Sequence, residues 1–307
     1  MSILIFGHKN PDTDTICSAI AYSKLKNKLG IDAKPVRLGE INEETKYVID
    51  YFNMDIPEII ENVAGKEIIL VDHNERTQTA NGFEEAKVLE LIDHHRISNF
   101  NVDEPLIVRM EPVGCTSTII FKMFKENNIV PSKEVAGLML SAIISDTLLF
   151  KSPTCTEYDV KAGKELSFIA EVDLEKYGLE MLKAGTNLGN KSNLELLNMD
   201  MKIFEIDKTR IGVSQVNTVN ESEVLEKKES LITEINNVID KEGLKTFIFI
   251  ITNILSNDST GIVVGKSVEV VEKAFGEKIY DNLITLKGVV SRKKQVIPPL
   301  TKAIQES

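Results

Sequence analysis

The chain has 307 residues, of which 42% are hydrophobic and 27% are charged, and its formal net charge is −11. This length allows two domains, and the composition is typical of a globular protein. The negative charge argues against nucleic acid bound along a broad basic surface, although a small anion could still occupy a local basic pocket. No apolar run approaches the ~18 residues that a membrane-spanning helix needs.

The first residues and the cysteines of the chain indicate the cellular compartment of the protein. The first residues, MSILIFGHKNPD, lack the basic start and the small-residue cleavage site of a signal peptide. The three cysteines, Cys17, Cys115 and Cys155, are widely spaced and odd in number. This pattern indicates reduced thiols, and we therefore expect a cytoplasmic protein.

Strand and helix patterns alternate through the first half of the chain. Short apolar runs predict strands at 3–6, 33–38, 67–72, 87–93 and 105–110. Helical periodicity predicts helices at 13–30, 42–52, 116–128 and 132–145, the last apolar enough to be buried. Such alternation is typical of βαβ units, so we predict an α/β domain with a mostly parallel sheet flanked by helices.

The pattern of predicted elements changes after a segment rich in glycine and asparagine, AGTNLGNKSN at 184–193. We expect a metal-binding domain at 1–186, a linker at 187–193 and a smaller α+β domain at 194–307. In the second domain the sequence predicts a hairpin around Lys208, a charged helix at 221–242 and strands at 246–252 and 261–265. A final region rich in lysine and proline follows.

The segment GIVVGKS at 261–267 superficially resembles a phosphate-binding loop. Thr260 stands where the first glycine of that motif belongs, and the spacer is an apolar run with β-type residues. We therefore interpret it as a strand.

Acidic residues and histidines follow four of the predicted apolar elements. In open α/β sheets, ligands bind outside the carboxyl ends of the strands, so residues at these ends can converge although they are far apart in sequence. A lone aspartate at such a place is more often a turn residue or helix cap, but four such segments together favour a site. The residues are His8, Asp12, Asp14, Asp72, Asp93, His94, His95 and Asp146; His73 is left open as a structural or supporting residue.

The donor types in this set indicate a metal centre. Clustered carboxylates repel one another unless cations neutralise them. Carboxylate with imidazole and without thiolate favours Mn²⁺ and also suits Co²⁺, Fe²⁺ or Zn²⁺. Two histidines and four aspartates of this set would give six ligands. Six are too many for one open metal site but suit two metal ions, the usual arrangement for phosphoryl hydrolysis.

A basic cluster near the end of the chain suggests phosphate binding. Arg292, Lys293 and Lys294 lie between two apolar runs, in a chain of net negative charge. Arginine can clamp a phosphate with two hydrogen bonds, and lysine acts as a point charge. A solvated loop is the alternative interpretation; Lys202 is a weaker candidate for phosphate binding.

The segments GHKNPDTD, VDHNE, LIDHH, SDTLLFKSPT and SRKKQ resemble those of family II inorganic pyrophosphatases, the manganese-dependent members of the DHH phosphoesterase superfamily. The resemblance runs from the first strand to near the C-terminus. SRKKQ and SDTLLFKSPT are more specific than LIDHH, which the whole superfamily shares.

The resemblance implies the roles of individual residues. Asp72 would bridge two metal ions, Asp93 would orient its neighbours, and His95 would face the substrate as a catalytic residue. Lys202, Arg292 and Lys293 would grip the phosphates, with Asn74 as a supporting polar contact. The implied metal ligands are His8, Asp12, Asp14, Asp72, His94 and Asp146.

The resemblance also implies an activity and an assembly. We expect hydrolysis of pyrophosphate by a metal-bridged hydroxide, in a two-metal site between the domains. The expected cofactors are two Mn²⁺ ions per subunit, with Co²⁺ as a substitute and additional Mg²⁺ carried by the substrate. We expect no nucleic acid or membrane partner, and a homodimer formed through the N-terminal domain.

Two other functions fit parts of the sequence. A DHH phosphoesterase acting on short oligonucleotides or cyclic dinucleotides would share the metal residues. Such enzymes resemble one another by a glycine-rich segment with a histidine in the second domain, whereas no histidine follows His95 here, and the few aromatic residues offer little for base stacking. The other alternative is a non-catalytic metal-binding or scaffold protein.

Overall fold

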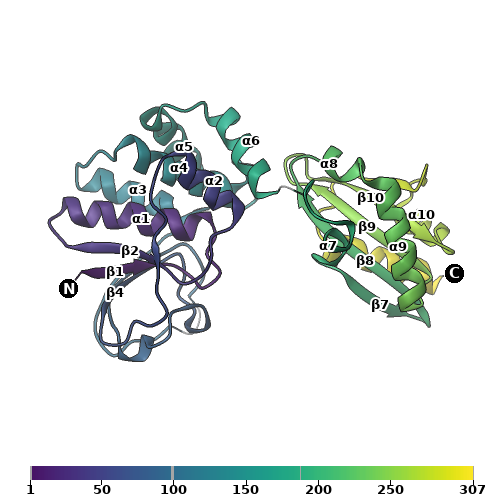
Figure 1. Cartoon of the computed structure of the whole chain (residues 1–307), viewed down its shortest axis with the longest axis horizontal. Helices are drawn as coiled ribbons and strands as arrows, with labels where there is room; N and C mark the ends of the chain where they lie inside the picture. Colours follow the sequence, from purple (N-terminus) through teal and green to yellow (C-terminus); the bar gives the residue numbers. More distant parts are fainter. Residues whose placement is uncertain (1, 98–99, 187, 307) are drawn as a thin grey trace. The chain divides into compact units, whose positions relative to one another are not determined.

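The computed structural model describes residues 2–97, 100–186 and 188–306, except for the side chain of Lys293. The chain forms two compact units, Met1–Gly185 and Thr186–Ser307 (Figure 1).

The first unit is built on a six-stranded sheet in which all neighbouring strands are parallel. The strand order is β3-β2-β1-β4-β5-β6, so β1 and β4 lie at its centre. This order places the carboxyl ends of β1, β4 and β5 side by side. The strands are β1 (Ile3–Phe6), β2 (Ala33–Arg37), β3 (Glu58–Ile59), β4 (Glu67–Val71), β5 (Lys87–Asp93) and β6 (Ile107–Met110).

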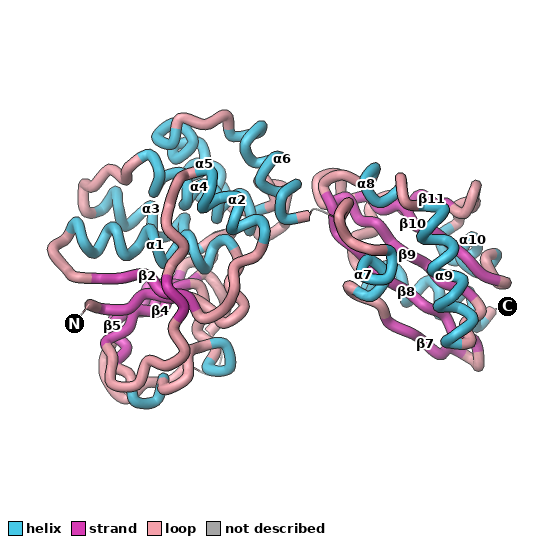
Figure 2. Tube along the Cα trace, viewed as in Figure 1, coloured by secondary structure: helices cyan, strands magenta, loops and turns pink. Residues whose placement is uncertain are grey.

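The α-helices of this unit gather on one face of the sheet (Figure 1). They are α1 (Thr13–Lys28), α2 (Glu43–Tyr51), α3 (Thr116–Glu126), α4 (Lys133–Thr147), α5 (Glu157–Ala170) and α6 (Leu174–Gly185). α4 is apolar around most of its surface and packs against both α1 and α5, as expected for a buried helix. Loops and the short 3₁₀ helices Arg76–Gln78 and Phe83–Glu85 lie on the other side (Figure 2).

Local sequence signals explain the helix ends. Asn42 and Ser132 cap α2 and α4 by accepting a hydrogen bond from a backbone N–H three residues on. Thr156 and Asp159 form a reciprocal capping box at the start of α5. The α/β fold predicted for this unit is confirmed, with α5, α6 and the two-residue strand β3 in addition to the expected elements.

The second unit contains a five-stranded mixed sheet with the order β11-β10-β9-β8-β7. β8 and β9 are parallel, and the other neighbours are antiparallel. The expected hairpin around Lys208 is confirmed, with Asp207 and Lys208 both at positive φ, as its tight turn requires. The strands are β7 (Lys202–Ile206), β8 (Thr209–Thr218), β9 (Thr246–Asn253), β10 (Asp258–Gly265) and β11 (Leu283–Leu286).

Helices cover both faces of this second sheet. Buried leucine and isoleucine side chains of α7 (Asn193–Asn198) and α9 (Lys228–Glu242) pack on one face. Side chains of α10 (Glu269–Phe275) and α11 (Ile297–Gln305) pack on the other. The segment GIVVG lies within β10, so its interpretation as a strand is confirmed.

One detail of the second unit differs from the sequence prediction. The single helix expected at 221–242 is two helices, α8 (Ser222–Leu225) and α9, because the chain leaves the helix at Glu226 and Lys227. The region rich in lysine and proline, for which the sequence predicts no particular elements, contains β11, a π-helical turn at Arg292–Val296 and α11. The prolines begin α11, where the missing N–H costs no hydrogen bond.

Among the described residues, no helix is long and apolar enough to cross a bilayer.

Candidate metal centre

The turn between β1 and α1 supplies the first group of side chains. Asp12 is the N-cap of α1 and accepts a hydrogen bond from the backbone N–H of Thr15 at 2.9 Å. Gly7 is needed here, because a Cβ on it would lie only 2.6 Å from Cγ2 of Thr15. His8 follows, and its Nε2 lies 3.4 Å from Oδ2 of Asp12.

Asp72 directly follows the central strand β4 and is 1% exposed. Its φ of +58° is in the left-handed region, which costs a residue other than glycine roughly 1–3 kcal/mol. The hydroxyl of Thr15 donates to Oδ2 at 2.6 Å, and that of Thr116 donates to Oδ1 at 3.2 Å. The carboxylate is therefore held from two helices, with both of its oxygens engaged.

The end of β5 supplies three consecutive residues with different surroundings. Asp93 is fully buried and accepts hydrogen bonds from the backbone N–H and Nδ1 of His95, at 3.0 and 2.9 Å. Nδ2 of Asn74 donates to the other oxygen of Asp93 at 2.6 Å. Nδ1 of His94 lies 3.1 Å from the carbonyl oxygen of Val113, so its Nε2 is directed to the carboxylates.

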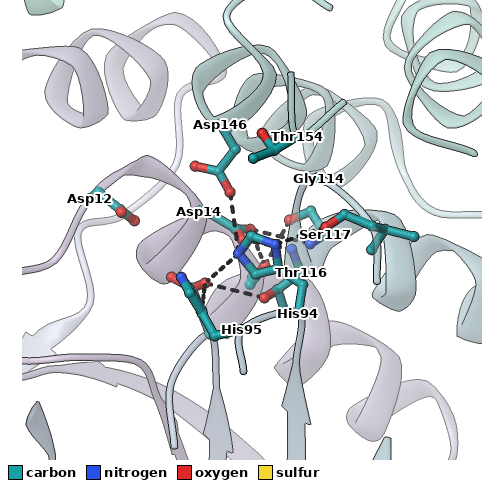
Figure 3. Close-up of polar contacts among 12 residues, drawn as sticks. Asp12, Asp14, His94, His95, Gly114, Thr116, Ser117, Asp146 and Thr154 are labelled. Atoms are coloured by element: carbon teal, nitrogen blue, oxygen red, sulfur yellow. Dashed lines mark hydrogen bonds and ion pairs between the residues drawn. The ribbon is translucent and has the colours of Figure 1, made fainter. Parts of the chain in front are cut away.

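The C-terminal end of α4 and the N-terminus of α3 complete the cluster. Asp146 lies in the last turn of α4, and its Oδ2 is 3.8 Å from Nε2 of His94 (Figure 3). Asp14 is fully buried and accepts backbone hydrogen bonds from Thr116 at 2.7 Å and Ser117 at 3.2 Å. The N–H groups and the dipole at the start of α3 thus stabilise this buried carboxylate.

These side chains converge around Asp72. Nε2 of His8 lies 3.6 Å from its Oδ2, and Nε2 of His94 lies 3.4 Å from its Oδ1. Within the described residues, metal-binding geometry is found in three groups whose donor atoms lie within 4.8 Å of one another. Asp72 belongs to two of these groups, and they are His8–Asp12–Asp72, Asp72–His94–His95 and Asp14–Cys115–Asp146.

The electrostatics of the cluster fit divalent cations. Burial and the neighbouring Asp14 raise the pKa of Asp72 to about 7, and the same two causes raise the pKa of Asp146 well above its usual range. Burial disfavours charged His94, but its hydrogen bond to Asp72 and the nearby carboxylates raise the pKa of His94 to about 9. Cations can replace the protons that such a group otherwise needs, and carboxylate with imidazole suits Mn²⁺.

A cavity of about 370 Å³ adjoins the cluster. His8, Asp72, Asn74 and His95 line it together with Asn10, His73, Glu75, Gln78 and Arg96. The side chain of His95 is 52% exposed, whereas those of His8 and His94 are 19% and 14% exposed. A bound anion can therefore reach His95 directly.

His73, whose role the sequence left open, is buried. Its Nδ1 lies 3.0 Å from the carbonyl oxygen of Val71, and burial lowers the pKa of His73 to about 4. The ring is therefore neutral and packs near Phe6, with a centroid distance of 6.2 Å. These contacts indicate that His73 has a structural role beside β4 and is not a metal ligand.

The predicted phosphate-binding residues lie in the second unit. Lys202 begins β7 and is exposed. The guanidinium of Arg292 pairs with Asp200, with Nη2 at 2.8 Å from Oδ1. Lys293 lies in the π-helical turn Arg292–Val296, and its side chain is outside the described part of the chain.

Two glutamines shape the segment that carries these basic residues. Oε1 of Gln295 accepts from the backbone N–H groups of Val290 and Ser291, both at 3.1 Å, and its Nε2 donates to the carbonyl of Gly288 at 2.7 Å. Oε1 of Gln215, on β8, accepts from the N–H of Arg292 at 3.2 Å. These bonds explain the glutamine of SRKKQ, and the serine is explained by its Oγ, which accepts from the backbone N–H of Lys294 at 3.3 Å.

Several residues of the site lie outside the sequence prediction. The hydroxyls of Thr15 and Thr116 contact Asp72, and the buried thiol of Cys115 lies beside Asp14 and Asp146. The only sequence signal for Thr15 is its place in the first turn of a helix that follows a metal-type motif, and Thr116 has no such signal. Gln215 has none, because it reaches Arg292 across 77 positions of sequence.

Comparisons with known proteins identify the class to which this fold and cluster belong. Residues 2–143 match the DHH family N-terminal domain, and residues 179–303 match the DHHA2 domain. Proteins from Bacillus licheniformis and Bacillus cereus, both named probable manganese-dependent inorganic pyrophosphatases, are 55% identical over 305 residues, covering 99% of this chain and 99% of each relative. The chain belongs to the family II, manganese-dependent inorganic pyrophosphatases.

Solved structures agree with this assignment. The structure of a candidate family II inorganic pyrophosphatase from Methanococcus jannaschii is 41% identical, with a TM-score of 0.64, and the match covers 99% of this chain and 100% of that one. An exopolyphosphatase-related protein from Bacteroides fragilis, 14% identical with a TM-score of 0.51 over 99% of this chain and 92% of its own, shares the fold alone.

Proposed function

We propose that this protein hydrolyses inorganic pyrophosphate to two phosphates at the cluster around Asp72. The observation that carries the proposal is the shared position of Asp72, which belongs to one donor group with His8 and Asp12 and to another with His94 and His95. One oxygen of Asp72 faces His8 and the other faces His94, an arrangement that suits two cations about 3.5–4 Å apart. Membership in the manganese-dependent family supports pyrophosphate as the substrate.

The proposed ligands are the six residues implied by the resemblance, and the proposed ions are two Mn²⁺, with Co²⁺ as a substitute. His8 and Asp12 would hold one ion, Asp14, His94 and Asp146 the other, and Asp72 both. Two such ions would lower the pKa of a shared water, so that hydroxide is available near neutral pH. Cys115 is a neutral neighbour of the second group, because burial raises the pKa of its thiol.

The remaining chemistry falls to side chains that face the substrate. Asp93 holds the ring of His95 by its Nδ1, and this hydrogen bond raises the pKa of His95. When the ring is protonated, its Nε2 can donate a proton to the leaving or bridging oxygen. Asn74 supports this arrangement through Asp93. Lys202, Arg292 and Lys293, with Mg²⁺ carried by the substrate, would neutralise the phosphoryl oxygens.

In this proposal the two units supply different parts of the reaction chemistry. The metal ligands all come from the first unit and the basic residues from the second. We keep the boundaries at 1–186, 187–193 and 194–307 as part of this proposal.

We further propose that two copies pair through the N-terminal domain. β6 is an edge strand of the first sheet, and Ile107 and Val108 on it are 63% and 50% exposed. Exposed edge strands with apolar side chains favour pairing with another chain. Light scattering on Val108→Lys tests this: a monomer supports it, and an unchanged dimer, or a wild-type monomer, contradicts it.

The thiols support the cytoplasm as the proposed location. Cys17, Cys115 and Cys155 are free, and the first two are buried. Unpaired cysteines of this kind persist in a reducing compartment.

One assay separates the proposed activity from its alternatives. The metal is removed with a chelator, Mn²⁺ and Mg²⁺ are restored, and phosphate release from pyrophosphate is compared with cleavage of a linear dinucleotide. Metal-dependent phosphate release from pyrophosphate, with a higher kcat/KM than for the dinucleotide, supports the proposal. Preferred cleavage of the dinucleotide would identify a nucleotide phosphodiesterase, and no turnover of either would indicate a non-catalytic metal-binding protein.

A further inference from the structure

Glu44 is a partly buried carboxylate that lies beside the metal centre but outside the three donor groups found among the described residues. It sits in the first turn of α2, and its Oε1 accepts two hydrogen bonds. The hydroxyl of Thr13 donates at 2.7 Å, and that of Ser145 donates at 2.5 Å. One oxygen thus joins two helices that are more than 100 residues apart in sequence.

The two donors occupy special positions. Thr13 lies between Asp12 and Asp14 at the start of α1, and it is fully buried. Ser145 directly precedes Asp146 near the end of α4. The bonds to these two hydroxyls therefore anchor backbone positions that are adjacent to proposed metal ligands.

The other side of Glu44 packs against the last residue of α6. A Cβ on Gly185 would lie 2.8 Å from Cβ of Glu44 and 2.9 Å from its Oε2. A side chain at this position would collide with Glu44, so the close approach requires glycine. The carboxylate is consequently enclosed on the side away from the two hydroxyls.

We propose that Glu44 is a positioning residue of the metal centre, which joins Thr13 and Ser145 and thereby fixes the ends of α1 and α4 that carry Asp12, Asp14 and Asp146. This inference rests on the proposed function, because it assumes that these aspartates bind cations. Residues that orient metal ligands typically contribute 10- to 100-fold in affinity. Because Glu44 acts through neighbours of the ligands, we expect an effect of about 10-fold, near the lower limit of that range.

The test measures Mn²⁺ binding by calorimetry on the full chain, with thermal unfolding of the metal-free protein alongside. Glu44→Ala should weaken Mn²⁺ binding about 10-fold, whereas Glu44→Gln, which retains an acceptor oxygen, should restore most of it. Glu43→Ala is the matched control, because Glu43 is the adjacent acid of α2 and is exposed. It should bind Mn²⁺ as the wild type does.

Gly185→Ala tests the same contact without removing the carboxylate, and it keeps the proposal testable if Glu44→Ala does not fold. Alanine favours a helix more than glycine does, so a purely local effect would stabilise the protein. Weaker Mn²⁺ binding by Gly185→Ala supports the proposal. A lower unfolding temperature with unchanged Mn²⁺ affinity in both variants would overturn it, and absence of Mn²⁺ binding by the wild type would instead overturn the proposed function.

Discussion

Asp93 holds His95 through a single oxygen, Oδ1, which lies 3.0 Å from the backbone nitrogen of His95 and 2.9 Å from its Nδ1. The other oxygen accepts from Asn74 at 2.6 Å. Both oxygens of this fully buried carboxylate therefore face N–H donors. An amide in its place would point its NH₂ at one of those donors, and a buried donor left without a partner is costly.

Asp93→Asn should for this reason lower kcat for pyrophosphate by about 10- to 100-fold, because His95 loses its fixed orientation. Steady-state kinetics with saturating Mn²⁺ and Mg²⁺ measure the effect. Asp103→Asn, at an exposed aspartate of the same unit, is the control and should behave as the wild type does. A kcat within twofold of the wild type would show that Asp93 does not orient His95.

Asp72→Ala should lose tight binding of both metal ions as well as activity. The reason is that Asp72 is the carboxylate common to the groups with His8 and with His94. Asp12→Ala should weaken only one ion, because Asp12 belongs to a single group. Titration calorimetry with Mn²⁺ gives the stoichiometry of each variant, and two tightly bound ions in Asp72→Ala would refute its bridging role.

Lys293→Ala should leave Mn²⁺ affinity nearly unchanged and raise KM for pyrophosphate by about tenfold or more, as expected for the loss of a charge-assisted contact. Lys293 belongs to the second unit, whereas all proposed metal ligands belong to the first. Calorimetry and steady-state kinetics on the same preparation separate the two effects. Changes of equal size in Mn²⁺ affinity and in the KM for pyrophosphate would contradict the proposal that Lys293 binds the substrate and not the metal ions.

Gln295→Leu should raise KM by about tenfold with little change in kcat, because its three hydrogen bonds hold the backbone at 288–291 in front of the basic residues. Gln305→Leu is a matched control at an exposed glutamine of α11. The same KM in both variants would mean that Gln295 does not shape the phosphate-binding segment.

Removal of the metal should destabilise the first unit. At free Mn²⁺ 100 times its dissociation constant, each bound ion adds about 2.7 kcal/mol to the free energy of unfolding. Thermal unfolding with Mn²⁺ and with excess chelator measures this difference. The unfolding temperature of Asp72→Ala should respond much less to Mn²⁺, and an equal response would place the stabilising ions elsewhere.

The sequence alone was sufficient for much of the α/β fold, because the alternation of apolar strands with amphipathic helices is a local pattern. It also indicated where the site would form, since the carboxyl ends of parallel strands meet at one edge of a sheet. The convergence of His8, Asp72, His94 and Asp146 is therefore the expected geometry. The prediction of a single helix at 221–242 was wrong, because no glycine or proline marks the interruption at Glu226 and Lys227.

Only the tertiary structure decided which side chains support the cluster. Thr15 reaches Asp72 across 57 positions, Ser145 reaches Glu44 across 101, and Gln215 reaches Arg292 across 77. Local pattern carries no information about such pairs, because the partners become neighbours only when the helices pack on the sheet. The positive φ of Asp72 likewise depends on the packed chain. Hydrogen bonds from the hydroxyls of two helices hold its buried carboxylate, and without them the backbone would relax to a more favourable φ.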